Sequence, residues 1–563
     1  MTPDSLLAEL DGRETGAPLA LALAEGVGLG LSDGEQQWAI ECDDPGSVVA
    51  EIDGQLSPRW VWWDRSTPEE LARHSVTVDR CWDVLTVHRL LHGGWKTSIP
   101  LAWAWLNDLS TESLPRMGQL GLLDAASEEG DNAEDPLRPD GHLRPEWATG
   151  GWTENPDRMA RWASLAFVAH DAQLTLLGDR DSPERALMTA RSESAAEMLC
   201  AELERDGLPI DEGEARRIIA QAEEERADEL VLRHLQPSQE VNLRNPAEVK
   251  TMLRRAGLDL PDTRAWRLEK IRDSEPLVDA LLTWRKAERI ATTYGTIWLA
   301  EHVAGGRLRG EWTSSDGAAG RMTASAGLHN LPAPMRTAIA PEASERLVRA
   351  DLGQIEPRVL AAVSGDEAFV AATQDDDLYQ PVAQRLGVTR EVAKVAILGA
   401  MYGATTGESA GALRGLQNNY PIAMGLLEEA AEAGRLGHDV FTTGGRRVPM
   451  WVDPSVSGDI DKAISVAAAR GRFARNALIQ GAAAEFFKVW AITVRRRVRH
   501  LGARIVLCLH DELLVLTPIE HADEVAALVA ECVQEAAHYW SPDPRVRFVA
   551  DVSIVKRWSD AKD

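Results

Sequence analysis

The segment RIVLCLHDELLVL, residues 504–516, restricts the fold of this chain more than any other stretch of the sequence. Two apolar runs enclose a short polar break that contains His510, Asp511 and Glu512. Such a pattern predicts a β-hairpin. Its tip would hold carboxylates on a rigid backbone, where they can meet water, metal and substrate. Taken alone, the simpler explanation, a turn that favours aspartate, is preferred.

A second predicted strand also delivers an aspartate at its end. The run RLVRA predicts a strand, and Asp351 follows it directly. Residues 353–365 then predict a helix, because Ile355, Val359 and Ala362 share one face. Two aspartates on strands from distant parts of the chain could hold two divalent cations about 4 Å apart, an arrangement that stabilises the attacking and leaving oxygens in phosphoryl transfer.

A third segment, TREVAKVAILGAMYGATTG, predicts a helix with one polar side. Arg390, Lys394, Leu398 and Tyr402 are four residues apart and therefore share a helix face. Arginine and lysine one turn apart suit a triphosphate, because one supplies a forked donor and the other a point charge. The alternative is a solvated helix rim.

The fourth segment is ARGRFARNALIQGAAAEF. Arg472, Asn476 and Gln480 again follow each other at steps of four along one helix face. Such a polar stripe could hydrogen-bond a nucleic-acid strand through its sugars, phosphates or minor-groove edges. Ordinary solvation of a helix explains the stripe equally well.

Composition narrows the class of protein. The 563 residues are 44% hydrophobic, which is usual for a soluble globular protein, and no apolar run has the length of a membrane span. The five cysteines include no CxxC pair, which predicts reduced thiols in a cytosol. The net charge of −28 argues against a generic basic DNA-coating protein, although a groove can still be locally basic.

The chain changes character along its length. The part up to about residue 185 mixes strand-like and helical runs and predicts an α/β domain. Its predicted elements are a strand pair in 18–41, a strand in 59–64, a helix in 83–94 and an acidic surface loop in 126–151. Residues 182–207 and 275–303 each predict one long helix.

In this order, the four segments resemble the palm and fingers of family A DNA polymerases, the DNA polymerase I type. DLGQIEPRVLAAVSGD resembles the family's motif A, REVAKVAILGAMYG its motif B and LHDELLV its motif C. GRMTASAGLHNLP resembles the stretch before motif A, and AELERDGLPID and RKAERIATTYG resemble two thumb segments. An ordered set of motifs is far more specific than any one of them.

The resemblance covers roughly residues 185–563 and implies an α+β multidomain protein with the right-hand polymerase fold, preceded by an N-terminal α/β ribonuclease H-like exonuclease domain. No 5′-nuclease domain is expected before it. The implied domains are an inactive exonuclease-like domain in 1–183, the thumb in 184–300, the palm in 301–385 and 471–563, and the fingers in 386–470.

The resemblance also implies roles for single residues. Asp351 and Asp511 match the aspartates that bind two Mg²⁺ ions, with Mn²⁺ as a substitute, and Glu512 matches the carboxylate beside them. Arg390 and Lys394 match the triphosphate-binding residues, and Lys394 also matches the proton donor to pyrophosphate.

Further matches concern the sugar, the base pair and the DNA. Glu356 matches the glutamate that crowds a ribose 2′-hydroxyl, and Tyr402 matches its partner tyrosine beside the nascent base pair. Gln354, Leu398 and Tyr379 complete the implied nucleotide site. The implied DNA contacts are Arg321, Arg472, Asn476, Gln480 and His510.

Four positions depart from the family pattern. Leu398 stands where an aromatic residue usually packs against the incoming sugar, and Tyr379 stands where a histidine usually lies near the phosphates. Leu352 and Gly353 replace the usual Tyr-Ser after the first aspartate. These departures affect the expected nucleotide affinity and sugar discrimination rather than the metal chemistry.

The N-terminal part resembles the family's 3′–5′ exonuclease domain more faintly. Asp64 fits the second exonuclease motif and Asp171 the third, with Phe167 in place of a tyrosine, and Asp83 lies on a nearby segment. The opening strand lacks the Asp-x-Glu of the first motif and offers only Glu25. We therefore expect a scaffold without proofreading activity; the alternative is that Glu25 acts with another acid.

The expected function is template-directed DNA polymerisation in replication or repair. The expected partners are primer–template DNA and dNTPs, with no membrane, for a monomer in the cytoplasm at the nucleoid. One alternative is a single-subunit phage-type RNA polymerase, which Glu356 disfavours because such an enzyme must admit a 2′-hydroxyl. The other is a catalytically dead DNA-binding protein, which would not need Asp351, Asp511, Arg390 and Lys394 together.

Overall fold

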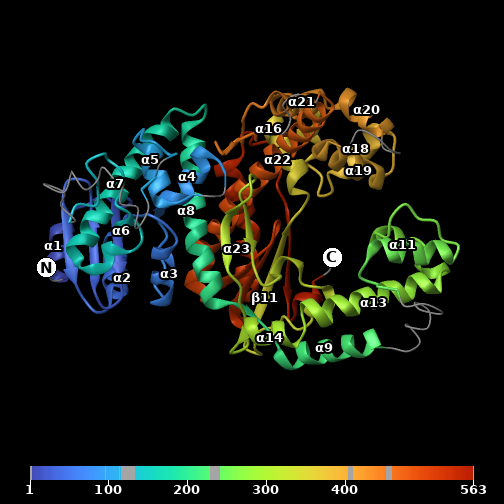
Figure 1. Ribbon diagram of the computed structural model, residues 1–563, viewed down its shortest axis with the longest axis horizontal. Helices are drawn as coiled ribbons and strands as arrows, with labels where there is room; N and C mark the ends of the chain where they lie inside the picture. The colour runs from blue at the N-terminus through green and yellow to red at the C-terminus, as the bar shows by residue number, and fades with distance from the viewer. Residues whose placement is uncertain are drawn as a thin grey trace, which may run out of the picture. The chain divides into compact units, whose positions relative to one another are not determined.

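The computed structural model describes residues 3–94, 97–112, 114–115, 134–227, 241–403, 410–451 and 460–561. The chain forms two compact units (Figure 1). Unit 1 comprises Met1–Arg205, Glu311–Ala324 and Val348–Ile554. Unit 2 comprises Asp206–Gly310, Ser325–Leu347 and Val555–Asp563.

Unit 1 begins with a five-stranded sheet in the order β3-β2-β1-β4-β5. Its strands are β1 (Pro18–Ala24), β2 (Gly28–Ser32), β3 (Gln37–Glu41), β4 (Arg59–Trp62) and β5 (Cys81–Asp83). β1, β4 and β5 run parallel, whereas β2 is antiparallel to both of its neighbours. This part is α/β, as predicted, but the predicted strand pair in 18–41 is wrong: the chain reverses twice there and forms three strands.

The two faces of this sheet carry side chains of different size. β1 alternates leucine and alanine, so its leucines enter one core while Ala20 and Ala22 enter the other. The alanine face is covered by α7 (Pro156–Gly178). A Cβ on Gly30 of β2 would lie 2.0 Å from the backbone nitrogen of Ala160, so only glycine allows this close approach of helix and sheet.

Short helices lie before, between and after these strands. They are α1 (Pro3–Leu10), α2 (Pro45–Leu56), α3 (Ser66–Arg73), α4 (Val84–His92), α5 (Ile99–Leu106) and α6 (Pro145–Ala148). The helix predicted in 83–94 is confirmed as α4 and begins at the N-cap Asp83, whose carboxylate accepts from the Thr86 amide at 2.8 Å. The surface loop predicted in 126–151 lies outside the described residues up to 133, and for 145–148 the prediction is wrong, because these residues form α6 with Trp147 buried.

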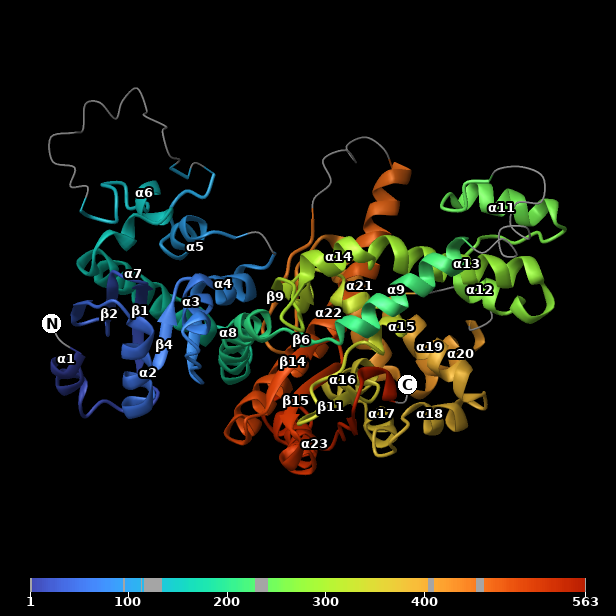
Figure 2. The same ribbon diagram turned by 90° about the horizontal axis from the view of Figure 1, so that it is seen from below.

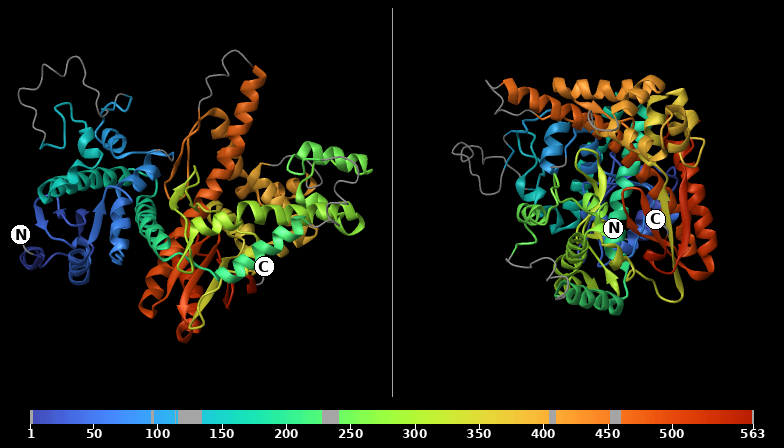
Figure 3. Two further views of the ribbon diagram at one scale, coloured as in Figure 1. Left: turned by 60° about the horizontal axis from the view of Figure 1, so that its bottom comes forward. Right: turned by 90° about the vertical axis from the view of Figure 1, so that its right-hand side faces the viewer.

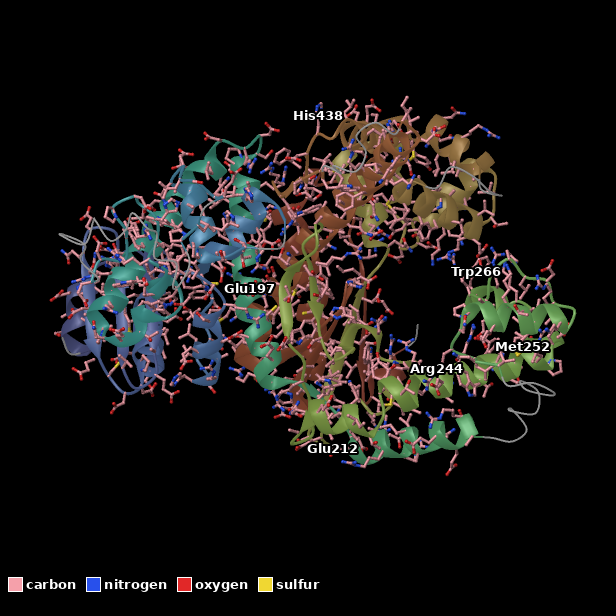
Figure 4. All side chains as sticks on the ribbon, in the orientation of Figure 1. Glu197, Glu212, Arg244, Met252, Trp266 and His438 are labelled. Atoms are coloured by element: carbon pink, nitrogen blue, oxygen red, sulfur yellow. The ribbon has the colours of Figure 1, made fainter. Side chains whose placement is uncertain are left out.

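A buried polar network joins α8 (Pro183–Asp206) to the rest of unit 1. Glu197, labelled in Figure 4, is 2% exposed and accepts hydrogen bonds from the hydroxyls of Thr86 and Ser314. Glu193, one turn earlier, is fully buried and pairs with Arg446 at 2.7 Å and with Lys488 at 2.5 Å. Because buried charges must be paired, the charge of Arg446 is neutralised inside the protein.

A second sheet of unit 1 has the order β14-β15-β11-β16. Its strands are β11 (Glu345–Leu352), β14 (Arg504–Cys508), β15 (Glu512–Pro518) and β16 (Ala550–Val555). β14 and β15 form the predicted antiparallel hairpin, with Cys508 opposite Leu513 (Figure 2). β11 lies between β15 and β16, so the end of β11 meets the tip of the hairpin.

The other helices of unit 1 follow β11 in the chain. They are α16 (Ile355–Ser364), α17 (Glu367–Ala372), α18 (Tyr379–Leu386), α19 (Arg390–Tyr402), α20 (Ala410–Asn419), α21 (Pro421–Leu436), α22 (Ile460–Val498) and α23 (Ala522–Trp540). α22 is one long helix, visible in Figure 3. Its length and apolar content would suffice to cross a membrane, but 89% of its most apolar window is buried inside the protein, which explains that composition by core packing.

Unit 2 is mainly helical. Its helices are α9 (Glu212–Ala227), α11 (Pro246–Arg255), α12 (Ala265–Glu269), α13 (Pro276–Thr293), α14 (Thr296–His302) and α15 (Ala333–Arg336), beside a small sheet of β6 (Leu208–Pro209), β7 (Val303–Ala304) and β8 (Arg307–Leu308). The single helix predicted in 275–303 is wrong, because the chain breaks between α13 and α14. A Cβ on Gly295 would lie 2.3 Å from the Ala291 carbonyl oxygen, so the break requires glycine.

Arg358 of α16 ties together several loops of unit 1. Its side chain is fully buried and donates only to backbone carbonyl oxygens. They belong to Gly353 (3.0 Å), Thr373 (2.7 Å), Asp375 (2.8 Å), Asp376 (2.8 Å) and Arg547. The planar guanidinium can serve all of them at once, which a lysine cannot do.

We expect Arg358→Met to lower the free energy of unfolding of this region by about 3–5 kcal/mol, because it leaves several buried carbonyls without donors. Hydrogen exchange measured by mass spectrometry should show loss of amide protection around residues 373–377. Arg545→Met is the matched control, since Arg545 is 55% exposed and pairs with Asp543 and Glu367 at the surface. Equal protection in both variants would contradict the role of Arg358.

Candidate active site

Two aspartates from distant parts of the chain meet at the edge of the second sheet. Asp351 is the penultimate residue of β11, and Asp511 lies in the turn between β14 and β15. The Leu352 amide donates to the Asp511 carbonyl oxygen at 2.7 Å, which joins the end of β11 to the hairpin tip. The structure therefore brings the two predicted metal ligands together.

The electrostatics of this pair favour a bound cation. Burial, followed by the negative charge of Asp511, raises the pKa of Asp351 to about 7. Desolvation also raises the pKa of Asp511, although this residue lies at the exposed rim of the site. Two carboxylates that are costly to ionise side by side are stabilised by a divalent cation, and hard ions such as Mg²⁺ prefer carboxylate oxygens. The residues thus fit the expected metal ions.

Glu512 and His510 flank Asp511 and face different groups. Glu512 is 6% exposed and forms an ion pair with Arg349 at 3.2 Å. His510 is more exposed; desolvation, and then the charge of Arg321, lower its pKa. Glu512 is therefore held inside the sheet, whereas His510 turns toward the adjoining cavity.

A cavity of about 320 Å³ opens beside the aspartates. It is lined by residues from every predicted motif, including Arg321, Gln354, Glu356, Tyr379, Leu398, Tyr402, His510 and Asp511. A nucleotide site between these segments must contact motif A, motif B and motif C, and this cavity contacts all three. We take this cavity as the candidate nucleotide site.

A hydrogen-bonded chain forms one wall of the cavity. Glu356, in the first turn of α16, accepts from Arg321 at 2.8 Å and from the Tyr402 hydroxyl at 3.0 Å. Gln480 of α22 also hydrogen-bonds Tyr402. Glu356 is thereby held in one position by two elements, so its carboxylate forms a rigid part of the wall.

The polar face of α19 is oriented as the spacing predicts. Arg390 forms an ion pair with Asp377 and lies over the Tyr379 ring, with its guanidinium carbon 5.6 Å from the ring centroid. The hydrogen bond that Arg390 donates to Asp377 is the largest cause of the raised pKa of Arg390. Lys394, one turn further, is exposed, and Leu398 and Tyr402 line the cavity. The four predicted residues therefore do share one helix face.

Comparison with known proteins identifies the family. A sequence profile of DNA polymerase family A matches residues 216–560. This chain belongs to DNA polymerase family A. The thermostable DNA polymerase I of Thermus thermophilus is 30% identical over 329 residues, which are 53% of this chain and 38% of that protein. The thermostable DNA polymerase I of Thermus aquaticus is 28% identical over 458 residues, which are 74% of this chain and 52% of that protein.

These curated relatives are longer, and this chain spans about two fifths to one half of their length. A solved structure, the POL domain of Pol1 from M. smegmatis in complex with DNA primer-template and dNTP, has the same fold. Its TM-score is 0.68 at 20% identity, and the match covers 99% of both chains. The predicted family and the α+β right-hand polymerase fold are confirmed. The domain boundaries and the exonuclease-like assignment of residues 1–183 stay predictions.

Two predicted DNA contacts of this family A member lie away from the nucleotide cavity. Arg472 packs beside Gly403, where a Cβ would lie 2.9 Å from its Cγ, and it lines a separate cavity of about 820 Å³. Asn476, one turn along α22, is half-buried. Of the stripe predicted on this helix, the described structure brings Gln480 alone to the nucleotide cavity, through its contact with Tyr402.

Sequence reasoning missed two residues that shape the site. Asp377 holds Arg390, and it also accepts from the side-chain amide of Gln354 at 3.0 Å. Arg349 lies between the carboxylates of the second sheet. An aspartate run before Tyr379 and an arginine inside the apolar strand RLVRA were the available signals. Gln354, predicted to bind substrate, lines the cavity and also hydrogen-bonds Asp377 and accepts from the Leu378 amide at 2.8 Å.

The structure places the predicted exonuclease residues Asp64 and Asp171 in different surroundings. Asp64 lines a cavity of about 190 Å³ together with Leu21, Ala22 and three tryptophans, Trp63, Trp152 and Trp162. The Trp63 indole donates to the Trp162 carbonyl at 3.1 Å, which anchors this part of α7 near Asp64. Asp171 lies nine residues after Trp162 along α7, which is about 13 Å at the usual helix rise. It contacts His170 instead, at 3.0 Å.

The other acids of this region have different surroundings. Asp83 is 1% exposed, accepts from the Trp62 indole at 2.9 Å, and has its pKa raised to about 8 by burial and by Glu197. Glu25 lies with Glu70 and His74, whose potential ligand atoms are all within 4.8 Å of one another. Phe167 packs against Gly34 of the turn after β2. No carboxylate besides Asp64 lines the described tryptophan cavity.

Proposed function

We propose that this chain is a template-directed DNA polymerase that adds dNTPs to the 3′ end of a primer. The primer 3′-hydroxyl attacks the α-phosphorus of the dNTP, and pyrophosphate leaves. Two Mg²⁺ ions held by Asp351 and Asp511, with Mn²⁺ as a substitute, would stabilise charge on the attacking and leaving oxygens. The observation that carries the proposal is the convergence of these aspartates beside a cavity walled by motif A and motif B, in a chain of family A.

In this proposal the residues of α19 handle the triphosphate. Arg390 exchanges Asp377 for phosphate oxygens, because its forked donors suit either anion. Lys394 contributes a second positive charge and donates a proton to the departing pyrophosphate. Glu356, held by Arg321 and Tyr402, fills the space that a ribose 2′-hydroxyl would need.

The proposed DNA partner is supported by basic and polar residues in both units. Arg321 and His510 line the cavity where the primer end would lie, and Gln480 contacts its Tyr402 wall. Arg472 and Asn476 lie further along α22, where the template would pass. In unit 2, a cavity of about 760 Å³ is lined by the basic residues Arg244, Lys250, Arg264, Arg285 and Arg289 together with Asp262 and Glu288. Basic clusters of this kind bind phosphates even on an acidic protein.

We also propose that the protein acts in DNA replication or repair, as a monomer in the cytoplasm at the nucleoid. Buried thiols support a reducing compartment, since Cys81, Cys200, Cys508 and Cys532 are buried and unpaired in the described structure. The fixed position of Glu356 disfavours an RNA polymerase. The paired aspartates and the polar face of α19 disfavour a binding protein without catalysis.

A primer-extension assay tests this function directly. We expect extension with dNTPs, dependent on the template sequence and on Mg²⁺ or Mn²⁺, and at most slow extension with rNTPs. Efficient use of rNTPs would favour the RNA polymerase alternative. Tight primer–template binding without any extension would favour the non-catalytic alternative.

We further expect no 3′–5′ proofreading by residues 1–183. Phosphodiester hydrolysis of this type needs carboxylates that converge on two metals, whereas the described tryptophan cavity offers Asp64 alone. With Mg²⁺ or Mn²⁺, no dNTPs and a labelled primer carrying a 3′ mismatch, the terminal nucleotide should stay in place for hours. Asp64→Ala is the control: steady removal by the natural chain that this variant loses would show an active exonuclease.

A further inference from the structure

An arginine inside the second sheet contacts three of its acidic residues. Arg349 lies on β11 two residues before Asp351, on the same face of the strand. Its side chain is 9% exposed and pairs with Asp351 at 2.9 Å, Glu512 at 3.2 Å and Asp551 at 3.5 Å. Glu512 begins β15 and Asp551 lies on β16, the two strands that flank β11. One guanidinium thus spans three neighbouring strands.

The contact with Asp351 is arranged so that the carboxylate keeps a free oxygen. Arg349 donates to Oδ2 of Asp351, which leaves Oδ1 available on a side chain that is 31% exposed. A guanidinium has no acceptor atom and cannot bind metal itself. It therefore acts on the metal site only through the carboxylates that it holds, as outer-shell partners of metal ligands do.

The charge of Arg349 has a second effect on the same site. Arginine stays protonated at every pH at which proteins are folded, so its positive charge is permanent. It offsets part of the negative charge of Asp351, Glu512 and Asp551, and it repels any cation that approaches Asp351. The ion pairs of Arg349 thus hold the carboxylates in place and also weaken their attraction for metal ions.

We propose that Arg349 is a positioning residue that holds Asp351 and Glu512 ready in the metal-free protein and keeps the affinity of the site for divalent cations low. The negative triphosphate of the incoming nucleotide restores the missing attraction, so the metal ions bind together with the nucleotide. This inference rests on the proposed function for the identity of the site. Its test, however, measures metal binding and needs no turnover.

The test is a titration of the full chain with Mn²⁺, in which free Mn²⁺ is measured by electron paramagnetic resonance. Asp351→Asn defines the binding that belongs to this site. Arg349→Met keeps an unbranched side chain of shorter reach and removes the charge, and we expect it to tighten the Asp351-dependent binding about tenfold or more. Arg349→Lys keeps the charge and should leave the Mn²⁺ affinity within about twofold of the natural chain.

Arg349→Gln is a second neutral variant, smaller and polar, that keeps the test decisive if the methionine variant does not fold. The titration is repeated with saturating dNTP and a primer that cannot be extended. The Mn²⁺ affinities of the natural chain and the neutral variants should then differ less than they do without dNTP. Weaker or unchanged Mn²⁺ binding in both neutral variants would overturn the proposal and leave Arg349 a packing residue. Binding that does not depend on Asp351 would also overturn it. Failure of the primer-extension assay would instead reject the polymerase function.

Discussion

Replacing Asp351 or Asp511 by asparagine should lower the rate of nucleotide addition by at least about 10³-fold, because each carboxylate holds metal ions that supply several kcal/mol of charge stabilisation in phosphoryl transfer. Binding of primer–template DNA should change little, since the aspartates lie at the sheet edge and carry no positive charge for phosphates. Single-turnover extension gives the rate, and fluorescence anisotropy with a labelled duplex gives the affinity.

The matched control for these variants is Asp523→Asn. Asp523 lies in the exposed first turn of α23, away from the nucleotide cavity, and its loss should leave extension unchanged. Extension by Asp351→Asn or Asp511→Asn at the rate of this control would reject the assignment of the two aspartates as metal ligands.

Glu356→Ala should raise the use of rNTPs relative to dNTPs by about 100-fold. Glu356 is 14% exposed and is fixed by Arg321 and Tyr402, so its removal opens space in the wall where a 2′-hydroxyl would otherwise clash. The ratio of kcat/KM for each nucleotide pair, measured on one template, gives the size of the effect.

Tyr402→Phe tests the rigidity of the cavity wall independently of its volume. This variant keeps the ring and the Glu356 side chain and removes only the hydroxyl that donates to Glu356 at 3.0 Å. We expect a smaller rise in rNTP use than for Glu356→Ala. If neither variant changes sugar selection, Glu356 does not exclude the ribose, and the departure at Leu398 becomes the residue to examine.

Local patterns predicted most elements that carry the site. The hairpin of β14 and β15, the strand β11 followed by α16, and the polar face of α19 all follow from residue spacing, because each depends on contacts within a short stretch of chain. Residue spacing did not predict breaks that depend on a single residue. The helix predicted in 275–303 is interrupted at Gly295.

The sequence by itself determined the strands, the helix faces and the family to which the ordered motifs belong. Only the tertiary structure decided which side chains share one environment. The order β15-β11-β16 places Glu512 and Asp551 around Arg349, and no periodicity within one strand contains that information. The same holds for the tryptophan cavity beside Asp64, which α7 closes while carrying Asp171 elsewhere. Pairings between distant segments are set by sheet order and helix packing, and they decide the charge and shape of the site.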